Sequence, residues 1–161
     1  MNADDMKVEL YNMDVELYDT RGDHAAVVRQ RLQDAGEDKD WEVVLATDTT
    51  LLLDYDSPNV PEQFYTVLTV LDATMGRGCG FKFYNSRSGN KHVIVTLPSP
   101  LTVVERIAWQ AAFGSDCKRE SLHLLSIARG DTNLNLLVMR KDRGSLVEKI
   151  NPDPGNIIHG L

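Results

Sequence analysis

The sequence predicts an α+β or mixed α/β protein in which helices cover a mostly antiparallel sheet. Apolar segments of strand length are interleaved with segments whose apolar residues recur at helical spacing. Two pairs of predicted strands are separated only by short polar turns, a spacing that favours antiparallel neighbours. The 161 residues, 42% hydrophobic and 25% charged, are enough for one globular domain with a substantial core.

The predicted strands differ in how they are buried. Residues 6–18 alternate apolar and polar side chains, as half-buried strands do, and form one or two strands. Residues 49–55 instead form an apolar run typical of a strand covered on both faces, separated from the preceding strand by a turn at Asp48. The remaining predicted strands cover residues 41–46, 81–84, 92–97 and 133–139.

Most of the predicted helices begin at a recognisable start signal. Asp23 precedes a helix over 25–36, and the segment 59–61, ending in Pro61, opens a helix over 62–74. A helix over 102–113 has the apolar spacing of an amphipathic helix, and Ser115 or Asp116 caps a further helix through 120–128. We expect residues 1–161 to form a single domain, with a flexible tail over 151–161 because that segment has two prolines and little pattern.

Charge is divided unevenly along the chain. Residues 1–75 contain 5 Lys and Arg against 17 Asp and Glu, whereas residues 76–161 contain 12 against 7. A basic second half allows a polyanion to bind on one face while the whole chain keeps its net charge of −7. The alternative is that the acidic residues only keep the first helices and loops exposed to solvent and bind nothing.

The composition also narrows the setting in which the protein works. No apolar run approaches the roughly 18–20 residues that span a bilayer, so we expect no membrane partner. The first seven residues have no apolar core of a signal peptide. Two cysteines, Cys79 and Cys117, are too few for a disulfide framework. We therefore expect a cytoplasmic protein.

Two carboxylates follow the most apolar predicted strand. Asp54 and Asp56 are two residues apart, so on an extended strand their side chains lie on the same face. Hard divalent cations prefer oxygen ligands, and such a cation would balance two acids at this position. The alternative is a strand end that turns with Asp and Ser-Pro.

The loop between the strands at 81–84 and 92–97 combines hydroxyl, glycine and cationic residues. Ser86, Ser88 and Gly89 lie close to Arg87, Lys91 and His92. Hydroxyl groups, main-chain N–H groups near a glycine and fixed cations all favour a phosphate. The alternative is an ordinary polar hairpin turn.

A third segment places Asp116 and Arg119 at the start of one predicted helix and Arg129 at its end. Asp116 is first of all a helix-capping signal. Arg129, just before a glycine, is either a surface arginine or a phosphate ligand.

Together and in this order, the three segments resemble the catalytic core of the archaeo-eukaryotic primase superfamily, of the primase-polymerase type found in phages and plasmids. The residues that carry the resemblance are LLLDYDSP at 51–58, SRSGNKHVIV at 86–95 and FGSDCKRES at 113–121. The longer stretch IAWQAAFGSDCKRESLHLLSIARG is also similar to phage-type primases. The resemblance covers residues 41–140.

The resemblance implies a sheet like that of an RNA-recognition motif, with Asp54, Asp56 and Asp116 as catalytic ligands of Mg²⁺ or Mn²⁺. Asp131 is the alternative third ligand. Ser88, Gly89, Lys91, His92, Arg119 and Arg129 would then bind the nucleotide. The implied reaction is the attack of a 3′-hydroxyl on the α-phosphate of a nucleoside triphosphate.

The implied partners are nucleoside triphosphates, a single-stranded DNA template that binds weakly to this chain alone, and a helicase or another replication protein. Two other functions use the same residues. A catalytically degenerate phage accessory protein would bind nucleotide or nucleic acid without turnover, and a metal-dependent nuclease would use a water nucleophile.

Overall fold

The protein is described by a computed structural model, which covers residues 24–130, 135–143 and 148–149. The predicted strand at 6–18, the alternative ligand Asp131 and the predicted tail at 151–161 lie outside these residues. The described part is α+β, with four helices and two small antiparallel sheets. The helices are α2 (His24–Asp34), α3 (Phe64–Thr74), α4 (Val103–Ala112) and α5 (Cys117–Ala128).

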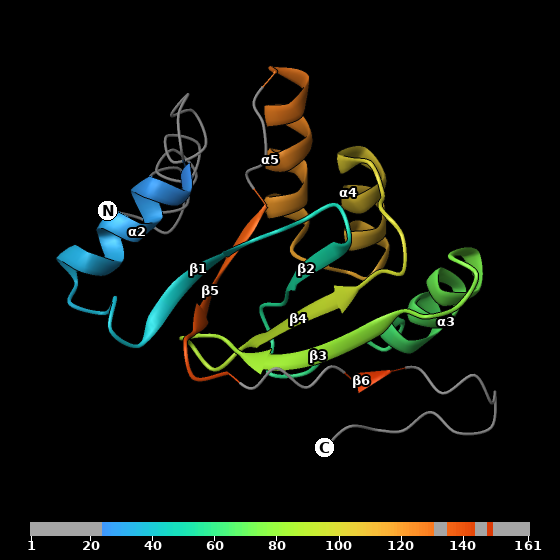
Figure 1. The fold of residues 1–161 in the computed structure, drawn as a ribbon, viewed down its shortest axis with the longest axis horizontal. Helices are drawn as coiled ribbons and strands as arrows, with labels where there is room; N and C mark the ends of the chain where they lie inside the picture. Colours follow the sequence, from blue (N-terminus) through green and yellow to red (C-terminus); the bar gives the residue numbers. More distant parts are fainter. Residues whose placement is uncertain (1–23, 131–134, 144–147, 150–161) are drawn as a thin grey trace, which may run out of the picture.

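The larger sheet has the strand order β2-β4-β3-β6. Its strands are β2 (Thr50–Asp54), β3 (Gly80–Asn85), β4 (Lys91–Thr96) and the short β6 (Glu148–Lys149). Both β2 and β3 pair antiparallel with β4, so they run parallel to each other with β4 between them. Since α3 connects β2 to β3, this is a split β-α-β unit followed by a hairpin (Figure 1).

One face of this sheet carries the main hydrophobic core. Leu51 and Leu53 of β2 point to this face, as residues at alternate strand positions do. They pack with Phe64, Leu68 and other residues of α3, and with Phe113 after α4. Phe64 and Phe113 are both 0% exposed, and their ring centroids are 5.3 Å apart. Burial of these rings therefore ties both α3 and the end of α4 to the sheet.

The opposite face is covered by a second, two-stranded sheet. It consists of β1 (Trp41–Leu45) and β5 (Leu136–Arg140), which pair antiparallel. Leu137 and Met139 of β5 pack against Leu52 of β2 in a smaller cluster. Strand β2 is thus buried on both faces, as its apolar run predicts.

The expectation of one mostly antiparallel sheet needs correction. The short segment between β1 and β2 predicts that they pair as neighbours, but β1 pairs with β5 and lies in the other sheet. Thr47 and Thr50 close the turn between them, with the Thr47 N–H 2.8 Å from Thr50 Oγ1. The chain then crosses from one sheet to the other. The β1–β5 sheet lies over the second face of β2, so both faces of β2 are buried.

The element boundaries otherwise agree with the sequence-based expectations to within a few residues. Of the two proposed caps of α5, Asp116 is the N-cap: its carboxylate accepts the Lys118 N–H at 3.0 Å. Helix α4 begins with a capping box between Thr102 and Glu105. The prediction of two successive helices after β4 is therefore confirmed.

A sharp corner joins α4 to α5 and sets the position of Ser115 and Asp116. Gly114 at this corner has φ +73°, and a Cβ there would lie 2.7 Å from Gln63 Nε2 and 3.1 Å from Pro61 Cγ. The carbonyl of Phe113 accepts the Tyr55 hydroxyl at 2.9 Å. The corner is thus held against the segments before α3 and after β2.

We predict that Gly114→Ala destabilises the protein more than Gly36→Ala. Both glycines have positive φ, so each alanine costs about 1–2 kcal/mol of backbone strain. Only at Gly114 does the new methyl group also crowd its neighbours: the exposed Gln63 amide can move away, but the Pro61 ring must shift, which adds about 1 kcal/mol. Urea unfolding of the two variants measures the difference. Equal loss of stability in both would contradict the close packing of the corner.

Candidate functional site

The outer edge of β2 is closed by side chains from α4 and α5. Among the described strands, β2 pairs only with β4, so the N–H and C=O groups of Leu52 and Asp54 point away from the sheet. The Leu52 N–H donates to Gln110 Oε1 at 3.1 Å, and the Leu52 carbonyl accepts Arg119 Nη1 at 2.8 Å. The Asp54 N–H donates to Ser115 Oγ at 3.1 Å. These bonds replace a missing neighbouring strand.

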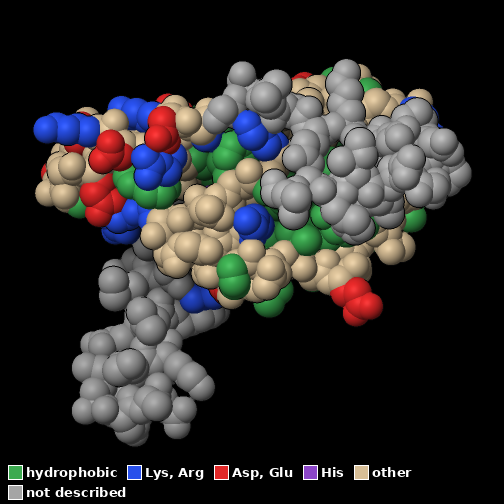
Figure 2. Space-filling view, turned by 90° about the horizontal axis from the view of Figure 1, so that it is seen from below, with side chains coloured by type: hydrophobic (Ala, Val, Ile, Leu, Met, Phe, Trp, Pro, Cys, Tyr) green, Lys and Arg blue, Asp and Glu red, His purple; other side chains and the backbone are tan. Residues whose placement is uncertain are grey.

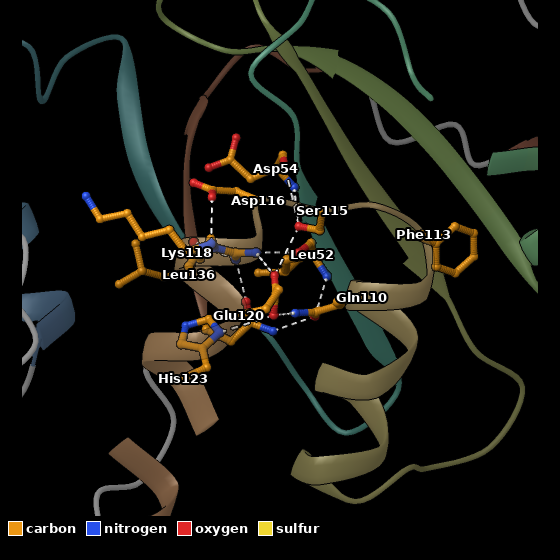
Figure 3. A network of polar contacts seen from close by, with 12 residues as sticks. Leu52, Asp54, Gln110, Phe113, Ser115, Asp116, Lys118, Glu120, His123 and Leu136 are labelled. Atoms are coloured by element: carbon orange, nitrogen blue, oxygen red, sulfur yellow. Dashed lines mark hydrogen bonds and ion pairs between the residues drawn. The ribbon is translucent and has the colours of Figure 1, made fainter. Parts of the chain in front are cut away.

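The same side chains converge on one buried carboxylate, that of Glu120 (Figure 3). Glu120 accepts hydrogen bonds from Gln110 Nε2 at 2.7 Å, from Ser115 Oγ at 3.0 Å and from Arg119 Nη1 at 2.9 Å. His123 Nδ1 lies 3.5 Å from Glu120 Oε2, the oxygen that also accepts from Gln110. Although burial opposes ionisation of Glu120, these partners outweigh it and lower the pKa of Glu120. The network is therefore built around a buried negative charge.

Beyond this network, β2 ends at an acid paired with an imidazole. Asp54 lies directly opposite His92 of β4 in the antiparallel register. Main-chain bonds join Tyr55 to Lys91, so the position next to it, Asp54 with His92, is a non-hydrogen-bonded pair in which side chains approach closely. His92 Nε2 is 3.1 Å from Asp54 Oδ1. His92 is buried, and its Nδ1 has no hydrogen-bond partner among the described residues.

Three carboxylates lie near the end of β2. The main-chain N–H of Asp116 donates to the Asp54 carbonyl at 2.8 Å, and Figure 3 shows the Asp54 and Asp116 side chains next to each other. Burial of Asp54 opposes its ionisation, but the hydrogen bond and charge of His92, with the charge of Arg119, lower its pKa. The pKa of Asp56 is raised by partial burial and by the negative charges of Asp116 and Asp54. Negative charge is thus concentrated here.

The turn between β3 and β4 has the hydrogen bonds of a tight hairpin. The Ser86 N–H donates to the Asn90 carbonyl at 2.7 Å, and Gly89, with φ +86°, donates its N–H to the Ser86 carbonyl at 3.1 Å. The Ser86 and Ser88 hydroxyl oxygens are 3.0 Å apart. Arg87 forms an ion pair with Glu37, which precedes β1. The predicted polar turn is confirmed, and its hydroxyl groups lie at an exposed tip.

Two of the three carboxylates, the imidazole and the turn share one cleft, of about 390 Å³, and Asp116 is not part of its lining. Two predicted metal ligands, Asp54 and Asp56, line it, as do the predicted nucleotide ligands Ser88, His92 and Arg119. The rest of the lining comes from the turn and from β5: Ser86, Arg87, Asn90, Leu136, Leu137 and Val138. Residues more than 80 positions apart in the sequence are thus brought to one opening.

Several predicted site residues lie elsewhere or are already engaged. Arg119 is 7% exposed and bonds to Leu52, Glu120 and residues of β5, so it forms an inner wall of the cleft. Gly89 is not part of the cleft lining, and neither is Lys91, whose ammonium group donates to Asn85 at 3.0 Å. Arg129 lies beyond the opposite end of α5 from Asp116, roughly 20 Å along the helix.

The three carboxylates do not form a preformed metal cage. In the part of the chain that the structure describes, no group of three or more His, Cys, Asp or Glu side chains is arranged to hold a metal ion. Their chemistry nevertheless suits a hard cation, since carboxylate oxygens are the preferred ligands of Mg²⁺ and Mn²⁺. The metal site stays a prediction.

The sequence did not identify the buried residues that hold the inner wall of the cleft in place. Gln110, Glu120 and Asn135 are all buried and hydrogen-bonded to one another or to Arg119. Gln110 and Glu120 are polar residues on the buried faces of predicted helices, and this is the one signal that could have identified them. The contribution of β5 to the cleft had no signal, because it depends on how the two sheets stack.

Comparisons with protein-family models, with curated proteins and with solved structures found no match to this chain. Within the described residues, no helix combines the length and the apolar character needed to cross a membrane.

We predict that Glu120→Gln destabilises the protein by roughly 3–5 kcal/mol near neutral pH, because it leaves the buried Arg119 without its counter-charge. The control Glu62→Gln, at an exposed position, should change stability by less than about 0.5 kcal/mol. Urea unfolding measures both. A Glu120→Gln protein as stable as the control would show that the charge is dispensable.

The pH dependence of stability gives a second measurement on the same residue. The pKa of Glu120 is lower in the folded protein than its ordinary value of 4.5. Its contribution to stability is therefore fully present above about pH 4.5 and is lost as pH falls through the lower, folded pKa. We expect the stability gap between wild type and Glu120→Gln to shrink on acidification. A gap that stays constant down to about pH 3 would contradict a charged Glu120.

Proposed function

We propose that this protein is a minimal primase-polymerase-like nucleotidyltransferase, which transfers nucleotides to a 3′-hydroxyl group in DNA replication or priming. The observation that carries the proposal is the cleft, in which an acidic strand end, a buried imidazole and a hydroxyl-rich turn meet. Charged groups of opposite sign side by side suit a metal–triphosphate complex, whose cation and anion need different ligands.

Each group in the cleft has a distinct part in this proposal. Asp54 and Asp56 would hold the divalent metal, with Asp116, which lies outside the cleft lining, as the third carboxylate. Metal binding would draw these side chains closer together than they lie now. When bound, Mg²⁺ or Mn²⁺ would stabilise charge on the attacking and leaving oxygens. The hydroxyl groups of Ser86 and Ser88, with Arg87, line the cleft and would contact the phosphate chain.

His92 is suited to position a phosphate rather than to move a proton. Its Nε2 is held by Asp54, and its Nδ1 is buried without a partner among the described residues. A buried polar atom without a hydrogen bond costs roughly 1–3 kcal/mol, a cost that a bound ligand can remove. We propose that the imidazole, as the cation with a proton on each nitrogen, donates from Nδ1 to the phosphate chain, while Asp54 accepts from Nε2 and fixes the direction of the ring.

The topology of the larger sheet supports the same class of protein. The order β2-β4-β3, with α3 connecting the two outer strands, is the split β-α-β arrangement of sheets like that of an RNA-recognition motif. Such a fold hosts many activities, so the proposal depends on the cleft and uses the topology only as support.

Single-stranded DNA is the template implied by this activity. The chain carries its excess of Lys and Arg in its second half. On the face shown in Figure 2, Lys and Arg side chains lie in several separate places, with Asp and Glu among them at one end. Since a dispersed basic surface neutralises few phosphates at once, we expect weak, salt-sensitive DNA binding without a helicase or another replication protein.

A second candidate is a nucleotide-binding accessory protein without turnover. It is favoured by the carboxylates, which do not form a preformed metal cage, and by Asp54, which is already bonded to His92. Such a protein would bind a nucleoside triphosphate but extend no primer.

The proposal is tested by primer extension with Mn²⁺ and a mixture of ribo- and deoxyribonucleoside triphosphates. We expect extension by wild type and a loss of at least about 100-fold in Asp54→Asn and Asp56→Asn, because each substitution removes a charged metal ligand. Calorimetric titration with Mn²⁺ alone should show weaker binding in both variants. The exposed Asp38→Asn serves as the control and should extend primers like wild type.

The outcomes separate the candidate functions. Nucleotide binding without extension by wild type would replace the transferase with the accessory protein. Degradation of the primer, dependent on Mn²⁺ and lost in Asp54→Asn, would indicate the nuclease. Unchanged Mn²⁺ affinity in both variants would remove the metal site and with it the proposal.

A further inference from the structure

In the part of the chain that the structure describes, one edge of β5 faces the cleft without a neighbouring strand. Beyond the two ends of the β1–β5 ladder, Ala46 donates its N–H to the Asn135 carbonyl and Lys141 donates to the Asp40 carbonyl. Because hydrogen-bonded pairs alternate along an antiparallel ladder, Val43 and Val138 form a non-hydrogen-bonded pair. The N–H and C=O groups of Val138 therefore point away from β1.

The two outward-facing neighbours of Val138 on this edge already have their carbonyl groups occupied by arginines. Arg119 Nη2 donates to the Leu136 carbonyl at 3.1 Å, and Arg143 Nη1 donates to the Arg140 carbonyl at 2.6 Å. Among the described residues, neither main-chain group of Val138 has a hydrogen-bond partner. As far as residues 24–130, 135–143 and 148–149 show, the edge is open at one residue, where it presents one donor beside one acceptor.

This open position belongs to the cleft. Val138, Leu136 and Arg119 line the cleft together with Asp54 and His92. The bond from Arg119 to Leu136 shows that the outward edge of β5 faces the same side as the buried wall of the cleft. A ligand whose phosphates contact the Ser86–Asn90 turn would thus have Val138 within the same opening.

The occupied carbonyl groups on either side argue against a peptide strand as the ligand. An added strand needs several outward N–H and C=O groups in succession, and both neighbouring carbonyl groups are taken. A small ligand needs only the donor and acceptor of one residue. We propose that the main-chain N–H and C=O of Val138 bind the nucleoside half of the nucleotide.

This inference rests on the proposed function and extends it to how the nucleotide is selected. Each nucleobase has an acceptor next to a donor along one edge, and a ribose hydroxyl can both accept and donate. Either one complements the two groups of Val138, so the base edge and the sugar are two sources of the same chemistry. The half-buried Leu136 and Val138 provide an apolar wall beside them.

A proline at position 138 tests the proposal because it removes the outward N–H without removing a bond of the β1–β5 ladder. The matched control, Val138→Ala, shortens the side chain and keeps both main-chain groups. We expect Val138→Pro to bind a nucleoside triphosphate about 3- to 10-fold more weakly than Val138→Ala, the loss of one hydrogen bond. Inorganic tripolyphosphate should bind both variants equally, because it has no nucleoside.

Parallel binding measurements with ribonucleotides and with deoxyribonucleotides distinguish a contact to the sugar from a contact to the base. A loss confined to ribonucleotides assigns the contact to the sugar hydroxyl, whereas an equal loss for ribo- and deoxyribonucleotides assigns it to the base. Thermal unfolding checks that Val138→Pro is folded. If Val138→Pro is not folded, NMR of the wild-type protein replaces the comparison of variants. A change in the ¹⁵N chemical shift of the Val138 amide on adding nucleotide, but not on adding tripolyphosphate, supports the contact.

The failures of the two proposals differ. Tripolyphosphate and nucleotide that bind wild type equally well, with no response at Val138, would overturn this inference and leave the phosphate site intact. If wild type binds neither ligand, both this inference and the proposed function are wrong.

Discussion

The hydrogen bonds to the buried carboxylate of Glu120 are the interactions on which the rest of the structure depends. Its hydrogen bonds fix Gln110, Ser115 and Arg119, and these three side chains close the open edge of β2. Arg119 in turn joins the β2 edge to β5 by donating to Leu52 and Leu136. One ionised group thus joins two helices and two sheets through polar contacts that add to the hydrophobic core.

The cleft exists because of this connection. Without Arg119 between them, the edges of β2 and β5 would have unsatisfied main-chain groups, which cost free energy when buried. Arg119 satisfies the main-chain groups of both strands at the inner end of the cleft. The outer end stays open, and there Asp54 and Val138 line the cavity. The same arrangement thus closes the protein interior and shapes the place where a ligand can enter.

The sequence was informative where the signal is local. Apolar runs, helix caps and the polar turn identify β2, α5 and the β3–β4 hairpin, and they bring attention to Asp54 and His92. It was not informative about strand partners, because the pairing of β1 with β5 depends on stacking two sheets. It also predicted Arg119 only as a nucleotide ligand, since no local pattern shows that its partners are Glu120, Asn135 and the β5 main chain.

The position of Asp54 opposite His92 has a consequence for how the site can change over evolutionary time. A slip of one residue between β2 and β4 would turn Leu51 and Leu53 out of the main core and toward the other sheet. The hydrophobic core therefore forbids the slip that would separate the acid from the imidazole. Insertions can accumulate at the exposed tip of the Ser86–Asn90 turn, whereas Asp54 and His92 stay opposite each other for as long as the strand register is kept.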